Sequence, residues 1–496
     1  MAPLPKVEFQ SWDRLSILTL AFMSHEYISK AILREFPYTP TSDQSQLIDL
    51  LGRFIRDGNS ASVFVLKGYA GTGKTTIVSS LVKILPSLRA SSVLLAPTGR
   101  AAKVLASYSG RQAFTIHKKI YRLLPSADGS INVVLQQNKH KNTFFIVDEA
   151  SMIGGSRSEQ AELFGGTNLL DDLIQYVNDG VNCRLILIGD TAQLPPVMTT
   201  ESAALSEKFL SQRYHLKLWC FELKEVVRQA QGSGILHNAT LIRQMLGSKV
   251  EGYPKLQLAG FGDFKRLEGP DAADEVNNAF MGREIEETLI VCRSNKRANL
   301  FNQHIRNRVL FREDEISAGD LLMVVKNNYF WLPQSSNAGF IANGDIMELK
   351  RIRRIEELYG FRFADVTVRM LDYPDEPDLE VKIILDTLGA EGPALSNPDG
   401  KRLFEEVAAD YVDIPNKGTR LAHIKNNPHF NALQVKFAYA LTCHKAQGGQ
   451  WPNVFVEMGY IPNKEPDTDY LRWLYTALTR ATDKVFLLNF TDGFFE

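Results

Sequence analysis

A glycine-rich stretch, GYAGTGKT from Gly68 to Thr75, has the residue types and the spacing that hold a polyphosphate. Glycines let backbone N–H groups turn toward phosphate oxygens, and the amino end of the following helix adds its positive dipole. In the pattern G-x-x-x-x-G-K-[ST], Lys74 reaches the β- and γ-phosphates and the Thr75 hydroxyl binds Mg²⁺. The predicted nucleotide contacts come from Gly68, Ala70, Gly71, Thr72, Gly73, Lys74, Thr75 and Thr76.

Polar side chains at the ends of two apolar strands supply the groups that hydrolysis needs. The first strand ends in Asp148 and Glu149, and the second leads into Asp190 and Gln193. Asp148 is suited to hold Mg²⁺ through water, and Glu149 to polarise the attacking water. Asp190 and Gln193 could contact the γ-phosphate and respond to its loss. A lone acidic pair is often only a cap, but this one lies in the same alternating sheet as the glycine loop.

Three residues outside these strands complete the predicted site. Arg228 and Arg480 would come from a second domain and neutralise the charge of the transition state, as arginine fingers do. Gln44 lies upstream of the glycine loop, where an amide could read the edge of adenine. Taken singly, each arginine is more often a surface residue, and Gln44 a solvated helix residue.

The elements that position these residues alternate between strand and helix. Apolar strands are predicted at 62–68, 91–98, 144–151 and 184–190, with helical patterns at 75–88, 99–109 and 169–179 between them. This alternation is typical of a parallel sheet that helices cover on both faces. Because ligands collect at the carboxyl ends of such strands, the polar residues above are expected at one edge.

One segment interrupts the alternation. Residues 118–142 contain two semi-alternating runs around Asp128-Gly129, a favoured turn for a β-hairpin. Such a hairpin is either an idle connection or a protruding pin.

The second half begins with the same pattern and then departs from it. Residues 287–310 read as a strand followed by a helix, and 320–327 and 340–349 as further strands. The stretch 350–430 is charged, broken by YPDEPD and SNPDGKR, and contains short alternating strands, which predicts a small β-rich insertion of barrel type. The earlier pattern resumes at 435–450.

Composition limits the partners and the compartment. With 56 Lys and Arg against 57 Asp and Glu, the net charge is −1, so a nucleic acid would be held in a local groove and not by a global field. The four cysteines lie far apart, without a C-x-x-C pair, which argues against a zinc or iron–sulfur site. The apolar run 17–23 is too short to span a bilayer, so a cytosolic protein is expected.

Taken in order, the motifs resemble those of superfamily 1 helicases, and most nearly the RecD/Dda-like branch that moves 5′→3′ on DNA. The matching strings extend from residue 38 to residue 488 and therefore cover nearly the whole chain. Several of them are individually quite specific. They are the upstream Gln44, GYAGTGKT, APTGRAAK, TIH, VDEAS, GDTAQLPPV, VVRQ, NGD, LTCHKAQG and YTALTRA.

The resemblance implies an α/β fold with two RecA-like P-loop motor domains and ATP between them. The hairpin corresponds to the family's strand-separating pin, and the insertion to its small β-barrel. The domains implied are a first motor at 1–200 carrying a pin at 114–142, a second motor at 201–349 and 431–496, and the insertion at 350–430.

The resemblance also assigns roles residue by residue. Lys74, Thr75, Asp148, Glu149, Gln193, Arg228 and Arg480 match the ATPase set, with ATP and Mg²⁺ as cofactors. Gly448 and Tyr475 match positions near the nucleotide. Thr98, His117, Thr442 and His444 match positions that grip the sugar-phosphate backbone. The pin lacks an obvious aromatic residue at its turn, and the insertion is longer and more acidic than a minimal barrel.

The implied function is an ATP-dependent DNA helicase that moves 5′→3′ on single-stranded DNA and opens forked or overhang duplexes. It would act as a monomer in DNA repair, replication or recombination, without a membrane partner, in the cytoplasm or at the nucleoid of a bacterium or phage-infected cell. Three alternatives remain open: an RNA or RNA/DNA helicase of the same superfamily, a translocase that does not unwind, and a non-catalytic scaffold. The intact set of Lys74, Asp148, Glu149 and the two arginines argues against the scaffold.

Overall fold

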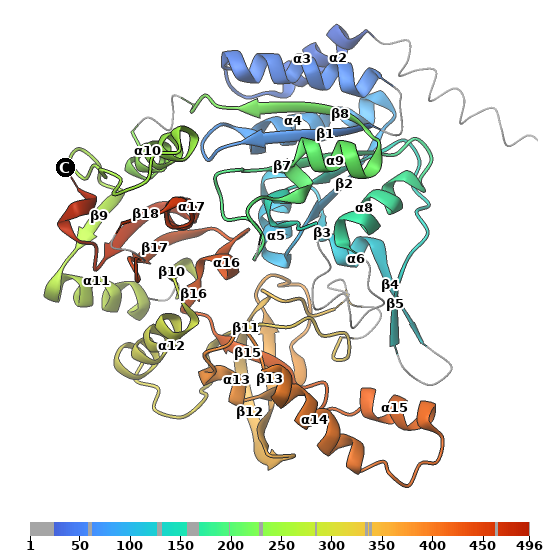
Figure 1. Cartoon of the computed structure of the whole chain (residues 1–496), viewed down its shortest axis with the longest axis vertical. Coiled ribbons are helices and arrows are strands. Elements are labelled where there is room, and N and C mark those ends of the chain that lie inside the picture. The colour runs from blue at the N-terminus through green and yellow to red at the C-terminus, as the bar shows by residue number, and fades with distance from the viewer. Residues whose placement is uncertain are drawn as a thin grey trace, which may run out of the picture.

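The computed structural model contains two parallel sheets, a closed barrel and a two-stranded hairpin (Figure 1). This arrangement confirms the predicted α/β fold class. The structure describes residues 24–57, 62–125, 131–155, 168–197, 199–227, 232–282, 285–332, 336, 340–461 and 465–495. Within these ranges no helix is both long and apolar enough to cross a bilayer.

The first sheet has six strands in the order β3-β2-β6-β7-β1-β8, all parallel. Its central strands are buried along their whole length, which explains why they read as continuous apolar runs. The strands are β1 (Ser62–Gly68), β2 (Ser91–Ala96), β3 (Ala113–Thr115), β6 (Thr143–Val147), β7 (Arg184–Gly189) and β8 (Lys217–Leu223).

Helices cover both faces of this sheet and form a separate apolar core on each. On one face lie α2 (His25–Glu35), α3 (Ser42–Arg56), α4 (Lys74–Ile84) and α5 (Gly99–Ser109). On the other lie α6 (Ile116–Ile120), α8 (Leu169–Asn178) and α9 (Glu207–Tyr214). Short 3₁₀ turns complete this half: η1 (Leu85–Leu88), η2 (Ala150–Met152) and η3 (Ala203–Leu205).

The end of the first domain lies beyond the predicted residue 200. Strand β8 pairs in parallel with β1 from Ser62↔Lys217 to Gly68↔Leu223, so the chain is still part of the first sheet at residue 223. The predicted boundary was wrong because β8, with the sequence KLWCFEL, is a half-exposed edge strand. It lacks the continuous apolar run that identified the buried strands.

A hairpin of two antiparallel strands projects from the first sheet (Figure 1). Strands β4 (Tyr121–Pro125) and β5 (Ile131–Leu135) pair from Tyr121↔Leu135 to Pro125↔Ile131. The predicted turn at Asp128-Gly129 lies outside the described residues. The hairpin is narrower than the predicted 114–142, because β3 and α6 belong to the body of the first sheet.

The second sheet has five parallel strands in the order β16-β10-β17-β18-β9. They are β9 (Phe264–Leu267), β10 (Thr288–Cys292), β16 (Ala440–Thr442), β17 (Trp451–Glu457) and β18 (Ala481–Leu488). Its helices are α10 (Gly234–Ser248), α11 (Gly269–Met281), α12 (Asn295–His304), α16 (Cys443–Ala446) and α17 (Thr468–Leu478). Three short turns also belong to this half: η5 (Ile285–Glu287), the π-turn η6 (Ile305–Val309) and η8 (Asp492–Phe494).

The barrel is larger than the predicted insertion at 350–430. It consists of β11 (Leu321–Val324), β12 (Ile346–Leu358), β13 (Phe361–Met370), β14 (Leu379–Ile384) and β15 (Leu433–Phe437), with β11 pairing β15 to close it. Helices α13 (Asp386–Gly389), α14 (Asn397–Ala409) and α15 (Lys417–Lys425) lie between its last two strands. Strand β11 was assigned to the second motor because periodicity cannot separate a short, fully buried barrel strand from a parallel-sheet strand.

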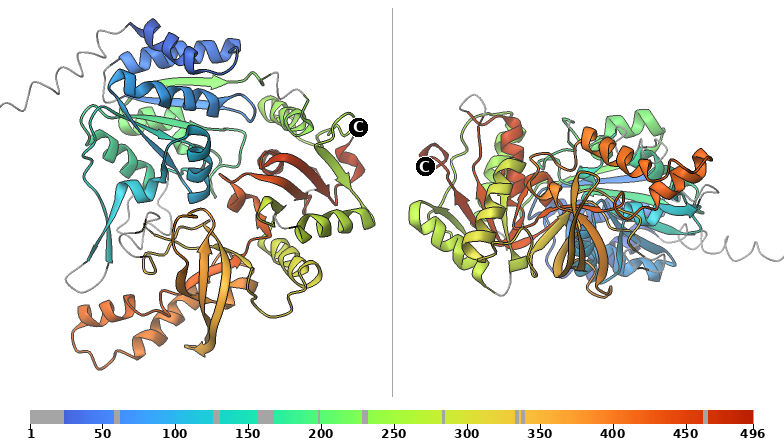
Figure 2. Two further views of the ribbon diagram at one scale, coloured as in Figure 1. Left: turned by 180° about the vertical axis from the view of Figure 1, so that it is seen from behind. Right: turned by 90° about the horizontal axis from the view of Figure 1, so that it is seen from below.

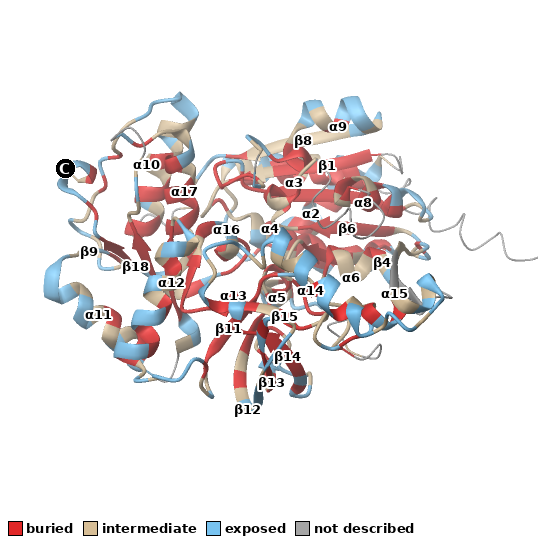
Figure 3. Cartoon of the chain, turned by 60° about the horizontal axis from the view of Figure 1, so that its bottom comes forward, coloured by how far each residue is buried: buried red, intermediate tan, exposed pale blue. Residues whose placement is uncertain are grey.

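The two sheets lie side by side, and the barrel lies below them with α14 and α15 extending toward the hairpin (Figures 1 and 2). Burial is concentrated in the strands of the sheets and the barrel, whereas helices such as α11 and α15 keep an exposed face (Figure 3). The second sheet and the barrel share one apolar core.

Candidate functional site

The strand order of the first sheet places the predicted chemical groups in a row. Strands β2, β6, β7 and β1 are neighbours, and their carboxyl ends lead into Thr98, Asp148, Asp190 and the glycine loop, respectively. Because all four strands are parallel, these ends meet at one edge of the sheet.

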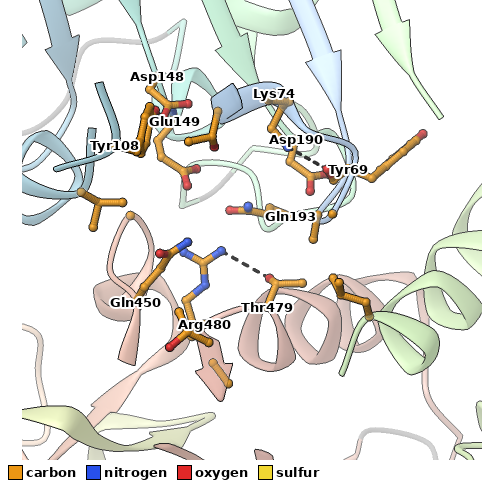
Figure 4. A pocket seen from close by; sticks show the side chains of 18 of the residues that line it. Tyr69, Lys74, Tyr108, Asp148, Glu149, Asp190, Gln193, Gln450, Thr479 and Arg480 are labelled. Atoms are coloured by element: carbon orange, nitrogen blue, oxygen red, sulfur yellow. Dashed lines mark hydrogen bonds between the residues drawn. The ribbon is translucent and has the colours of Figure 1, made fainter. Parts of the chain in front are cut away.

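A cavity of about 450 Å³ opens between this edge and the second sheet (Figure 4). The structure brings most of the predicted ATPase residues to its wall, and Gly68, Thr72, Thr76 and Tyr475 do not line it directly. The predicted residues in the wall are Ala70, Gly71, Gly73, Lys74, Thr75, Asp148, Glu149, Gln193, Gly448 and Arg480.

The glycine loop leaves the amino end of α4 without a side-chain cap. Gly73 is the N-cap residue at φ 86°, in the left-handed region, and no side chain caps the first N–H groups. A Cβ at Gly73 would lie 2.5 Å from Gln44 Nε2, so only glycine fits. The Lys74 ammonium donates to the carbonyl oxygens of Gly68 (2.6 Å) and Tyr69 (2.9 Å), which hold it at the loop.

Gln44 braces the loop and does not line the cavity. Its amide oxygen accepts from Thr41 N (3.0 Å) in a capping box, and its Nε2 donates to Thr72 O (3.0 Å). The side chain is 2% exposed. The hydrogen bonds of Gln44 in this structure are therefore structural, and its contact with adenine stays a prediction.

The acidic pair lies opposite the loop. Asp148 accepts from the Tyr108 hydroxyl (2.5 Å) and from Glu149 N (2.9 Å). Glu149 adopts φ 51°, a left-handed conformation that turns its side chain into the cavity (Figure 4). Burial raises the pKa of Glu149, and nearby Arg480 and Lys74 oppose this shift. A carboxylate with a raised pKa is a stronger base, which suits proton abstraction from water.

The oxygen donors fit Mg²⁺. The Thr75 hydroxyl and the Asp148 carboxylate both line the cavity beside Lys74. Mg²⁺ keeps several waters and takes one or two carboxylates together with substrate phosphates, so two protein donors are sufficient. Thr75 and Asp148 would therefore hold the ion, which would neutralise charge on the phosphates.

The second sheet contributes Arg480 from the end of α17. The Arg480 guanidinium donates to Thr476 O (3.0 Å), Gly449 O (3.2 Å) and Thr479 Oγ1 (3.3 Å), and the residue is 3% exposed. These bonds aim the side chain at the acidic pair across the cavity (Figure 4). A fixed guanidinium in this position can stabilise charge that develops on a phosphoryl group.

Tyr475 joins the two sheets although it does not line the cavity. Its hydroxyl accepts from Ala70 N of the glycine loop (2.9 Å) and donates to Asp190 Oδ2 (2.6 Å). Asp190 is 1% exposed, and burial raises its pKa. One side chain of the second sheet thus contacts both the phosphate loop and the end of β7.

The segment after Asp190 is also held by the second sheet. Leu194 N donates to Thr476 Oγ1 (2.9 Å), and Gln447 Nε2 donates to Leu194 O (2.8 Å). The neighbouring Gln193 lies in the cavity wall with a buried amide oxygen that has no hydrogen-bond partner. An unpartnered amide at this point is available to a ligand or a water in the cavity.

Arg228 lies outside the described residues. The residue before it contacts the glycine loop, because Val227 N donates to Gly71 O (3.0 Å).

Among the described residues, no hydrogen bond, ion pair or ring contact joins the four predicted nucleic-acid residues to one another. Thr98 caps α5 by accepting from Ala101 N (3.2 Å), and His444 is exposed. Thr442 precedes α16 without a side-chain cap bond. The His117 ring packs near Tyr121 (5.7 Å) and Phe340 (6.3 Å). Burial lowers the pKa of His117 to about 4, so the imidazole is neutral at pH 7.

Sequence reasoning missed Tyr108, the partner of Asp148. Ala101, Val104, Ser107 and Tyr108 all line the cavity from α5. Their spacing of three, six and seven residues is that of one helix face, so helical periodicity could have identified this wall.

Two family models match the chain in the order of its two halves. An AAA domain matches residues 49–253, and a UvrD-like helicase C-terminal domain matches residues 437–488. The first match contains the glycine loop and the acidic pair, and the second contains Gly448, Tyr475 and Arg480.

Two curated relatives align along most of the chain. An uncharacterized protein of Acanthamoeba polyphaga mimivirus is 22% identical, over 86% of this chain and 95% of its own length. The ATP-dependent RecD2 DNA helicase of Deinococcus radiodurans is 26% identical, over 85% of this chain and 46% of its own length.

Solved Pif1 helicases are also similar to the chain. A Pif1 helicase studied on forked double-stranded DNA has a TM-score of 0.46 at 16% identity, covering 92% of this chain and 94% of that one. Bacteroides Pif1 in complex with ADP-AlF3 and single-stranded DNA has a TM-score of 0.44 at 15% identity, covering 92% and 95%.

The ordered motifs, the two family models and the RecD2 relative agree with the composite cavity between the sheets. Together they support a superfamily 1 helicase of the RecD-like type, and hence an ATP-dependent hydrolase.

Proposed function

We propose that this helicase moves 5′→3′ along single-stranded DNA and separates duplex DNA at the β4–β5 hairpin. The observation that carries the proposal is the composite cavity, in which Lys74 and Glu149 of the first sheet face Arg480 of the second. Catalysis at such a site depends on the distance between the two sheets. ATP binding and hydrolysis would therefore close and open the gap, and each cycle would advance one motor domain along the strand.

The roles within the hydrolysis step follow from the contacts. Lys74 exchanges the carbonyl oxygens of Gly68 and Tyr69 for phosphate oxygens when ATP binds. Glu149 takes a proton from the attacking water, and Arg480 neutralises charge on the transferred phosphoryl group. Thr75 and Asp148 would hold Mg²⁺.

Tyr475 is suited to report the state of the nucleotide. Its hydroxyl contacts the glycine loop and Asp190, so a shift of either group moves α17. Arg480 follows the end of the same helix by two residues and donates to Thr476 O of that helix, which couples the sensing contact to the catalytic one.

DNA as the substrate is supported by the family motifs and by the RecD2 relative. The predicted backbone contacts Thr98, His117, Thr442 and His444 show no base-reading pattern, as a motor that accepts every sequence requires. A complete nucleotide cavity within one chain supports action as a monomer. A role in DNA repair, replication or recombination is consistent with this substrate.

Unwinding assays on duplexes with a single overhang test the proposal. We expect ATP-dependent unwinding of a duplex with a 5′ DNA overhang and little unwinding of the matched duplex with a 3′ overhang. A preference for the 3′ overhang would overturn the polarity. Stronger stimulation of ATP hydrolysis by a matched RNA oligonucleotide than by DNA would favour an RNA helicase, because the strand would then be recognised through its 2′-hydroxyls.

A further inference from the structure

A second polar cavity, of about 410 Å³, lies at the base of the β4–β5 hairpin. We call it the hairpin-base pocket. Basic and amide side chains dominate its wall, and Tyr176 of α8 completes it. The basic and amide residues are Lys119, Arg122, Lys139, His140, Gln136 and Gln137.

Hydrogen bonds fix the wall of this pocket. Gln136 N donates to Ile120 O (2.8 Å), and the Gln136 amide donates to Lys119 O, which ties the end of β5 to α6. Asn138 is 5% exposed; its amide donates to Tyr176 O (2.9 Å) and its Oδ1 accepts from His140 N (2.9 Å). The basic side chains are therefore mounted on an ordered frame and not on a loose loop.

The pocket concentrates positive charge that the rest of the described chain does not balance. No acidic residue lines it, and Lys119, Arg122 and Lys139 form no ion pair with any described residue. Burial lowers the pKa of Lys119, and burial together with Lys119 lowers the pKa of His140. The protein as a whole has a net charge of −1, yet this pocket gathers partly buried basic side chains without an acidic partner. Such a local concentration of positive charge indicates a site for an anion.

The position of the pocket separates it from the nucleotide cavity. Lys139 and His140 precede β6, whereas Asp148 and Glu149 follow it, so β6 lies between the two sites. Arg122 lies on β4, one residue beyond Tyr121, which faces the protein and donates to Asp172 (2.6 Å). Because side chains alternate along a strand, Arg122 faces the opposite side of the hairpin, where it is exposed.

We propose that the hairpin-base pocket binds backbone phosphates of the nucleic acid that the hairpin divides. This inference rests on the proposed function, since it requires a junction at the hairpin. Lysine and arginine with amide donors suit phosphate oxygens and carry no base-specific pattern. The phosphates belong either to the duplex ahead of the hairpin or to the displaced strand, and both present the same chemistry.

The test uses the double variant Arg122→Gln/Lys139→Gln of the full chain. The matched control is Lys30→Gln/Arg34→Gln, which removes two exposed positive charges from α2. Binding is measured by fluorescence anisotropy over a range of salt concentrations. The substrates are a single strand, a duplex with one 5′ tail, and a fork with both tails.

Each lost phosphate contact makes the negative slope of log K against log salt shallower by about 0.9, which amounts to roughly a tenfold loss of affinity at 0.1 M salt for each of the two substituted residues. We expect this loss for the pocket variant on a junction substrate, with single-strand binding and single-strand-stimulated ATPase equal to those of the control. A loss on both the tailed duplex and the fork assigns the phosphates to the duplex. A loss on the fork alone assigns them to the displaced strand.

Two results would overturn the inference: unchanged slopes on both junction substrates, or an equal loss on the single strand. Failure of the proposed function has a different signature, because the unsubstituted protein would then not unwind the duplex with one 5′ tail. The ATPase stimulated by a single strand also shows whether the variant is folded.

Discussion

Each parallel sheet contains a strand–turn–helix unit, but the amino end of the helix is uncapped in the first sheet and capped by a side chain in the second. After β1, the N-cap of α4 is Gly73 at φ 86°, and no side chain accepts from the first N–H groups. After β10, the N-cap of α12 is Ser294, whose hydroxyl accepts from Arg297 N (3.2 Å). A capped helix has used a donor on its own chain, whereas an uncapped one keeps its donors for phosphate. The cap thus distinguishes the nucleotide-binding sheet from its partner.

The first sheet faces the shared cavity with the carboxyl ends of its strands, whereas the second sheet faces it with the amino ends. The first sheet contributes the carboxyl ends of β1, β6 and β7. The second contributes Gly448 and Gln450 before β17, and Thr479 and Arg480 before β18. A second RecA-like unit can therefore complete a site without a phosphate loop, because the end of one helix, α17, supplies its arginine.

The substitution with the largest expected effect is in the nucleotide-binding sheet. Lys74→Ala removes the only ammonium in the cavity wall among the described residues, and we expect ATP hydrolysis to fall at least about 10³-fold. The control is Lys83→Ala, which changes an exposed lysine on the same helix. Steady-state ATPase assays with single-stranded DNA check the result, and a fully active Lys74 variant would contradict a phosphate role for the loop.

Arg480→Ala tests the partner sheet. We expect kcat for ATP to fall roughly 10³-fold, because an arginine finger acts on the transition state. Nucleotide affinity, measured by titration with a fluorescent ATP analogue, should change far less. Lys484→Ala, an exposed change on β18, is the control. Equal losses in affinity and kcat would mean that Arg480 only binds the nucleotide.

Tyr475→Phe tests the contact between the sheets. It deletes the hydroxyl that joins Ala70 N and Asp190, so we expect about a tenfold loss of DNA-stimulated ATPase and a loss of about 1–3 kcal/mol in unfolding free energy. Tyr470→Phe removes a hydroxyl that donates to Met458 O (3.0 Å) within the second sheet. If both variants lose the same ATPase activity, the bridge has no role in coupling.

The pH dependence tests Glu149. The base must be deprotonated, and its pKa is raised above the ordinary value of 4.5, so activity requires a higher pH than an ordinary glutamate would. We expect kcat to fall about tenfold for each unit of pH below that raised pKa. A pH–rate profile under saturating ATP measures this limb. A midpoint at or below 4.5 would show that another group acts as the base.

Ser294→Ala has the smallest expected effect and sharpens the comparison of the caps. Loss of the cap on α12 should lower the unfolding free energy by about 1 kcal/mol. ATP hydrolysis should stay unchanged, because Ser294 does not line the cavity. Urea unfolding followed by circular dichroism, with ATPase assays on the same samples, checks both parts. A lower ATPase rate would mean that the second helix end also serves the nucleotide.

Several features of the fold and the site could be predicted because they are local. Continuous apolar runs identified β1, β2, β6 and β7, since strands buried on both faces need apolar residues throughout. The spacing of Gly68, Gly73, Lys74 and Thr75 identified the loop, because backbone geometry there requires these residue types.

Other features could not be read from local patterns. The edge strand β8 and the barrel strand β11 were assigned to the wrong domains, because the sequence of a short strand does not indicate which sheet it joins. The hydrogen bonds of the Gln44 amide with Thr41 and Thr72 were not foreseen, and its contact with adenine stays a prediction. Helical spacing could have placed Tyr108 in the cavity wall, but not its hydrogen bond with Asp148, which lies 40 residues away in the sequence.

The sequence by itself therefore determined the chemistry of the first sheet, where the glycine loop and the acidic pair follow strands with a clear apolar signature. Only the tertiary structure decided which edge of the second sheet meets them, and that Tyr475 and Arg480 at the end of α17 reach across. The physical reason is that a loop's conformation depends on its own residues, whereas the meeting of two sheets depends on the packing of the whole chain.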